Sequence, residues 1–291
     1  MWQAESVAAG LRAAWPTLRV SLEVIETKGD IRLDVPVWEL GGQGVFVKEV
    51  QAAVLDGRSD AAVHSAKDMP SEGTPGLDLT AMPRRADPRD ALVGARLADL
   101  PTGAVVATGS VRRRAQLAWL RPDLTFTGVR GNIGTRLGKV PPGGAVVIAA
   151  AALDRLGLRG SASEILSPDT MLPQVGQGAI GLECRADDHV TAGLLAVLED
   201  TQTHVAVTAE RAMLAQLGSG CNLPVGAYGI VRGESIELEG LLASIDGRIL
   251  FRSRVAGPVD DPAGLGAALA SELLDGAGGR GVLAIDGAGL R

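Results

Sequence analysis

The chain has 291 residues, 46% of them hydrophobic, and a formal net charge of −6 at neutral pH. The length suggests about two domains, with three small ones possible, and the acidic balance argues against generic binding to nucleic acid or anionic membranes. The two cysteines and three scattered histidines give neither a disulfide framework nor a metal-ligand spacing, so we expect no metal.

The beginning of the chain, MWQAESVAAGLRAAW, lacks a basic end followed by an apolar run, so we expect no signal peptide. The longest apolar run, residues 145–153, is too short to span a bilayer. These features predict a cytoplasmic protein whose two thiols, Cys184 and Cys221, are free.

The first half of the chain alternates predicted strands and helices. Residues 20–25 alternate apolar and polar side chains, as a half-buried strand does, and residues 46–57 have apolar side chains at helical spacing, with Gly57 as the stop. A short strand at 60–64 and the loop SAKDMPSEGTPG follow. This order is typical of a parallel βαβ sheet.

The same order recurs in the middle of the chain. Residues 104–109, 125–129 and 145–151 are predicted strands, and Ser110 is the expected N-cap of the helix that carries SVRRRAQLAWL. A further helix is expected from about Asn132.

Two polar stretches, residues 83–90 and about 199–202, are the expected domain boundaries. After Cys221 the apolar pattern has a period of two, with a hairpin signal at Asp246–Gly247, and residues 262–274 read as a helix. We therefore expect a small α+β domain at the C-terminal end.

Six arginines lie between residues 112 and 136. Arg112, Arg113 and Arg114 fall on the first turn of the predicted helix, where cations oppose the helix dipole, so helix stability does not explain them. A bound anion would meet free backbone N–H groups and guanidinium forks there. The alternative is a solvated, charged helix face.

Other polar side chains could join this anion site. Thr108 and Ser110 could donate from their hydroxyl groups. Arg130 and Arg136 follow the next strand, so in an open α/β sheet both could face the same crevice.

The loop HSAKDMPSE carries Ser65, Lys67 and Asp68 directly after a buried strand. A carboxylate beside a lysine stays ionised and could stabilise a developing cation or transfer protons. The alternative is a surface turn with a salt bridge worth about 0–1 kcal/mol. His64 ends the strand and is expected to be structural.

Cys221 lies in the glycine-flanked loop GSGCNLPVG and could serve as a nucleophile or an attachment point. The alternative is an inert buried thiol, which is the expectation for Cys184 in its apolar strand. The glycines of LPQVGQGAIGLECR favour a structural crossover, with Gln177 as a candidate ligand contact.

Taken together, these motifs resemble the porphobilinogen deaminase (hydroxymethylbilane synthase) family. The matching stretches run in family order over nearly the whole chain: ETKGDIRLDVP, GGQGVFVKEVQAAVLDGRSDAAVHSAKDMPSE, DPRDALV, TGSVRRRAQLAWLRPDL, VRGNIGTRL, LPQVGQGAIGLECR, VTAERAML and GCNLPVGAY.

The resemblance implies an α/β fold with two periplasmic-binding-protein-like lobes, each with a mixed sheet, and a small α+β C-terminal domain. The first lobe would comprise residues 1–83 with 179–196, the second lobe 89–172, and the C-terminal domain 201–291.

The implied activity is that of a transferase of haem and tetrapyrrole biosynthesis, which joins four porphobilinogen molecules, with loss of ammonia, into hydroxymethylbilane. The family is usually monomeric and acts on this small molecule without nucleic acid or membrane partners. The resemblance implies a dipyrromethane cofactor bound through a thioether to Cys221, with Asp68 as the catalytic carboxylate. It assigns cofactor binding to Ser65, Lys67, Asp68, Thr108, Ser110, Arg112 and Arg113. It assigns substrate binding to Arg130, Arg136, Arg155 and Gln177.

The chain departs from the family pattern at its beginning. The family normally starts with a strand that is central in the first lobe, whereas here Met1–Gln3 coincide with the helix that follows it. We expect the missing strand to leave an apolar face and backbone groups unsatisfied, and the true start to lie upstream of Met1. Residues 27–45 are glycine-rich, and a lid over the cleft is a hypothesis for them.

One alternative comes from a different class, a non-catalytic bilobal protein that binds polycarboxylates or other anions. It explains the arginines but not a third domain with a loop cysteine. A nucleic-acid-binding protein would use the arginines of 112–136, but the negative charge and the few aromatic side chains argue against it.

Overall fold

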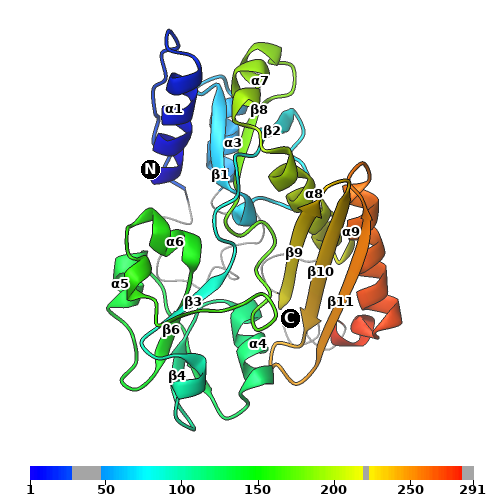
Figure 1. Ribbon diagram of the computed structural model, residues 1–291. Helices are drawn as coiled ribbons and strands as arrows, with labels where there is room; N and C mark the ends of the chain where they lie inside the picture. The colour runs from blue at the N-terminus through cyan, green and yellow to red at the C-terminus, as the bar shows by residue number, and fades with distance from the viewer. Residues whose placement is uncertain (28–46, 219–222, 284–291) are drawn as a thin grey trace.

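The computed structural model describes residues 1–27, 47–218 and 223–283 of the chain. They form two α/β lobes, each built on its own sheet, and a third domain with an antiparallel sheet and two helices (Figure 1). The predicted fold class is therefore confirmed. None of the helices in this described part is long and apolar enough to cross a membrane.

The first lobe contains a three-stranded sheet in the order β1–β8–β2. Its elements are α1 (Trp2–Ala14), α3 (Lys48–Leu55), β1 (Ala61–Ser65), β2 (Leu77–Ala81), β8 (Ile180–Arg185) and α7 (His189–Leu195). Gly57, with φ 72°, follows α3 as predicted. Both strand pairs are antiparallel, so the parallel pairing predicted for this lobe is absent from the described residues.

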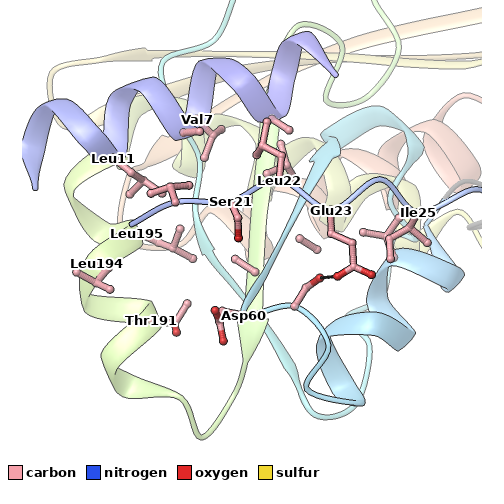
Figure 2. A pocket seen from close by; sticks show the side chains of 18 of the residues that line it. Val7, Leu11, Ser21, Leu22, Glu23, Ile25, Asp60, Thr191, Leu194 and Leu195 are labelled. Atoms are coloured by element: carbon pink, nitrogen blue, oxygen red, sulfur yellow. Dashed lines mark hydrogen bonds between the residues drawn. The ribbon is translucent and has the colours of Figure 1, made fainter. Parts of the chain in front are cut away.

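Residues 20–25 were predicted to form the first strand of this lobe and form none in the structure. A groove of about 400 Å³ separates them from β1 (Figure 2). Val7 and Leu11 of α1 and Leu195 of α7 line the groove, and Val24 of the extended segment is 71% exposed. Within the described residues β1 pairs only with β8, so its other edge faces the groove, and residues 20–25 do not pair with it.

The second lobe contains a five-stranded mixed sheet in the order β5–β4–β6–β3–β7. Its elements are β3 (Asp90–Val93), β4 (Val105–Ala107), α4 (Val111–Leu120), β5 (Thr125–Thr127), α5 (Ile133–Leu137), β6 (Ala145–Ala149), α6 (Ala150–Arg155) and β7 (Glu164–Ile165). Strands β5, β4 and β6 are parallel, whereas β3 runs antiparallel to β6 and β7. Every residue of β6 is buried, because apolar clusters cover both faces of the sheet.

The third domain packs two helices against a sheet in the order β11–β10–β9. Its elements are α8 (Thr201–Gln216), β9 (Val225–Arg232), β10 (Ser235–Ala243), β11 (Leu250–Pro258) and α9 (Pro262–Ser271), with a π-helical turn at Glu272–Gly276. Met213 of α8 and Leu269 of α9 share one core cluster with the sheet. Gly247 has φ 71° between β10 and β11, which confirms the predicted hairpin. Short 3-10 turns elsewhere span Ala66–Asp68, Leu97–Asp99, Arg159–Ser161 and Ala196–Leu198.

The groove beside β1 leads to a test of the first lobe. We expect an N-terminal extension of about six alternating Val and Thr residues plus a short turn to raise the thermal midpoint, because a strand in the groove would bury apolar side chains and pair with β1. Scanning calorimetry measures the shift. A Gly-Ser extension of equal length is the control, and equal midpoints for the two would contradict the expectation.

Candidate active site

The loop after β1 is held by the crossover segment that leads into β8. The Ala66 N–H donates to the Ala179 carbonyl at 3.0 Å. Gly176, with φ +67°, passes so close that a Cβ there would lie 3.0 Å from the carbonyl carbon of Ala66 and from the nitrogen of Lys67. The crossover glycine therefore sets the position of Lys67 and Asp68.

Lys67 and Asp68 lie among cations from the second lobe. Burial lowers the pKa of Lys67; the charge of Asp68 opposes this shift, whereas Arg113 and Arg136 lower the pKa further. Burial also lowers the pKa of Arg155, and the charge of Asp68 opposes that shift too. The structure thus brings the predicted catalytic carboxylate together with cations from α5 and α6.

Several of these cations lack a carboxylate partner. In the part of the chain that the structure describes, no salt bridge involves Lys67, Arg130, Arg136 or Arg155. The Arg136 Nε donates to the Gly131 carbonyl at 2.7 Å, whereas the Arg155 Nε is buried without a hydrogen-bond partner. Gathering unpaired cations is costly unless an anion offsets their charge. The cluster therefore has the properties of an anion-binding site.

Arg112 and Arg113 are engaged in a different way, by the buried carboxylate of Asp90. The Arg112 Nη2 lies 2.7 Å from Asp90 Oδ2, and the Arg113 Nη2 lies 2.7 Å from Oδ1. Their remaining contacts are also internal, since Arg112 Nη1 donates to Leu172 O and Arg113 Nη1 to Val147 O. The guanidinium groups of Arg112 and Arg113, which were predicted to bind carboxylates of a ligand, thus bind a carboxylate of the protein itself.

Asp90 was missed by the sequence analysis, which placed it in a polar boundary segment. The only signal was a carboxylate at the first position of the apolar strand DALV. Burial alone raises the pKa of Asp90, but the charges of Arg112 and Arg113 outweigh this effect and hold the pKa well below its usual range.

Gln177 supports Asp90 through a hydrogen bond. Its side chain is buried, and Nε2 donates to Asp90 Oδ1 at 2.9 Å and to the Pro88 carbonyl at 2.7 Å. The substrate contact assigned to it stays a prediction, and its Oε1 is the atom without a partner.

The hydroxyl groups of Thr108 and Ser110 lie at the start of α4. Ser110 Oγ accepts from the Arg113 N–H, which confirms the predicted N-cap, and Thr108 Oγ1 accepts from the Ser110 N–H at 3.2 Å. Both oxygens accept, so both O–H groups can still donate to an anion. Ser65 Oγ accepts from Gln3 Nε2 of α1 at 2.8 Å.

The remaining predictions concern His64 and the cysteines. His64 is buried, with Nε2 lying 3.0 Å from Glu183 Oε2, which agrees with a structural role. Cys184 is buried, as expected. Cys221 and most of the predicted lid at 27–45 lie outside the described residues.

Residues 1–193 match the family model described as porphobilinogen deaminase, dipyromethane cofactor binding domain, and residues 204–275 match the model of its C-terminal domain.

Three curated relatives carry the name porphobilinogen deaminase. The relative from Roseiflexus sp. (strain RS-1) is 52% identical over 97% of this chain and 94% of its own length. The relative from Acidothermus cellulolyticus is 50% identical over 94% of this chain and 84% of its own length. The relative from Pelobacter propionicus is 45% identical over 97% of this chain and 92% of its own length.

Among solved structures, the chain is similar to YhfZ from Shigella flexneri at 16% identity, over 75% of this chain and 92% of that one. The TM-score of 0.33 is too low to support an argument about the lobes.

The Asp90 contacts predict a pH-dependent effect of substitution. We expect Asp90→Asn to lower the free energy of unfolding at neutral pH by about 3 kcal/mol, because two buried guanidinium groups lose their counter-charge. The pKa of Asp90 is lower in the folded state, so its stabilisation is present above the unfolded value of about 4 and is lost as the pH falls below it. The difference between wild type and variant therefore shrinks in acid.

Urea unfolding at a series of pH values measures this difference. Asp99→Asn, which removes an exposed carboxylate, is the matched control. A loss that stays constant from neutral to acid pH would contradict the account.

Proposed function

The chain belongs to the porphobilinogen deaminase family, and we propose that Asp68 performs its chemistry among cations that bind the carboxylates of the substrate. The activity is that of porphobilinogen deaminase in tetrapyrrole biosynthesis, a transferase that joins porphobilinogen units with loss of ammonia. The chain matches both family models, that of the cofactor-binding domain and that of the C-terminal domain. This match excludes the alternative of a non-catalytic anion-binding protein.

The main support for the proposed site is the group of cations around Asp68 that have no carboxylate partner in the described part of the chain. Each porphobilinogen carries two carboxylates, so the growing chain gains negative charge with every addition. Lys67, Arg136 and Arg155 have no carboxylate partner in the described part of the chain, and the charge of Asp68 acts on all three. A polycarboxylate would supply the missing counter-charge.

The role of Asp68 follows from the charge that develops during the reaction. The bond between the methylene carbon and the ammonium nitrogen of the substrate breaks, ammonia leaves, and positive charge spreads over the pyrrole ring. An ionised carboxylate stabilises that charge and can accept a hydrogen bond from the pyrrole N–H. A new carbon–carbon bond then forms to the growing chain, and a proton leaves the attacking pyrrole carbon.

The dipyrromethane cofactor fits the cations around Asp68, because it too carries carboxylates. The chain matches the cofactor-binding domain of the family, and the bound cofactor supplies the carbon to which the first substrate is joined. We propose that Lys67 binds its carboxylates directly and that the hydroxyls of Thr108 and Ser110 donate to them. The Ser65 hydroxyl, which donates to Gln3 Oε1 at 3.2 Å, would join them after leaving Gln3. Arg112 and Arg113 share a single carboxylate, Asp90, so one positive charge remains to attract the cofactor.

The other assignments are part of the same proposal. Arg130, Arg136 and Arg155 would bind the substrate, and Cys221 would hold the cofactor through a thioether. The small-molecule substrate is porphobilinogen. Action as a monomer and location in the cytoplasm stay predictions.

Substitution of Asp68 tests the proposed catalytic role. We expect Asp68→Asn to lower kcat by at least about a hundredfold, because an amide offers no negative charge to the developing cation. Ammonia release and tetrapyrrole formation measure the rate. Asp78→Asn, which changes an exposed carboxylate on β2, is the control. A kcat for Asp68→Asn within about threefold of the control would refute the role.

A further inference from the structure

The two lobes meet at a contact between an indole and a guanidinium group. The Arg155 Cζ lies 5.6 Å from the centroid of the Trp2 ring. Trp2 is the first residue of α1 in the first lobe, and Arg155 is the last residue of α6 in the second. The N-terminal end of α1 lies toward α6 in Figure 1. The distance is within the range of a cation–π interaction.

Among the described residues, no hydrogen bond or salt bridge fixes the Arg155 side chain. Its Nε is buried without a hydrogen-bond partner, and no carboxylate of the described residues forms a salt bridge with it. An arginine binds a carboxylate in bidentate fashion only when the plane of its guanidinium group is correctly oriented. The face of the Trp2 ring is the contact that can set this plane.

Stability of the first lobe does not account for Trp2. Its side chain is 47% exposed at the beginning of a helix, where an aromatic ring gives no capping benefit. The second tryptophan of the same segment differs. Trp15, at the other end of α1, donates Nε1 to the Leu194 carbonyl at 3.2 Å within the first lobe. The chain therefore offers a matched pair of tryptophans, one at the contact between the lobes and one away from it.

We propose that Trp2 is a positioning residue, whose indole face holds the Arg155 guanidinium in the orientation that receives a carboxylate of the incoming substrate. This inference rests on the function proposed above, which assigns Arg155 to substrate binding. Trp2 acts through Arg155 and not on the reacting atoms, so its loss weakens substrate binding more than it slows the chemistry.

Steady-state kinetics of the cofactor-loaded enzyme with porphobilinogen test the proposal. A cation–π contact of ordinary strength predicts that Trp2→Leu raises KM about three- to tenfold with kcat nearly unchanged. Trp2→Phe, which keeps a ring, should restore most of the binding. Trp15→Leu should leave KM unchanged. If Trp2→Leu fails to fold, Trp2→Gln replaces it.

The Arg155→Gln background separates a positioning role from a direct one. If Trp2 acts through Arg155, Trp2→Leu has no further effect on KM once Arg155 is replaced. An equal rise in KM in both backgrounds would overturn the proposal, as would a Trp2→Leu enzyme with the KM of Trp15→Leu.

The same variants distinguish failure of this inference from failure of the assigned site. A raised KM for Arg155→Gln beside an unchanged KM for Trp2→Leu refutes only the role of Trp2. An unchanged KM for Arg155→Gln refutes the substrate-binding role of Arg155, and the inference with it. Loss of kcat in Asp68→Asn is independent of both results.

Discussion

The buried carboxylate of Asp90 is the constraint on which the arrangement of the arginines on α4 depends. It lies at the first position of β3 and is completely buried, and it neutralises part of the charge of Arg112 and Arg113 on the first turn of α4. Two guanidinium groups could not be buried there without it. The first turn of α4, which follows Thr108 and Ser110, is thereby fixed against the sheet.

The same carboxylate is connected to the third domain through a continuous set of polar contacts. Gln177 of the crossover binds Asp90, and its carbonyl accepts from Arg85 Nε at 2.9 Å. Arg85 in turn forms a salt bridge with Glu210 of α8, a residue that is completely buried and also accepts from the backbone N–H groups of Gly176 and Gly229. Polar contacts thus link Asp90 of the second lobe, through Gln177 and Arg85, to Glu210 of the third domain, and loss of Arg85 would leave the buried carboxylate of Glu210 without its salt bridge.

Local sequence patterns predicted the features that depend on neighbouring residues. The N-cap at Ser110, the buried strand β6 and the turn at Gly247 each follow from side chains within a few positions of one another. Contacts between distant residues could not be predicted in this way. From the sequence alone, Arg112 is predicted to bind an external anion, because its partner, Asp90, lies 22 positions away in a segment that resembles a linker. Residues 20–25 have the alternation of a strand, but a strand also needs a partner at hydrogen-bonding distance, and the groove separates this segment from the free edge of β1.

Intact-protein mass spectrometry of the freshly purified chain tests most directly whether Cys221 holds a polycarboxylate cofactor that the cations around Asp68 would bind. The account predicts an added mass of two linked pyrrole units on the wild type and on Cys184→Ser, and no added mass on Cys221→Ser. A wild-type chain that remains unmodified after incubation with porphobilinogen, or a Cys221→Ser chain that still carries the added mass, would contradict it.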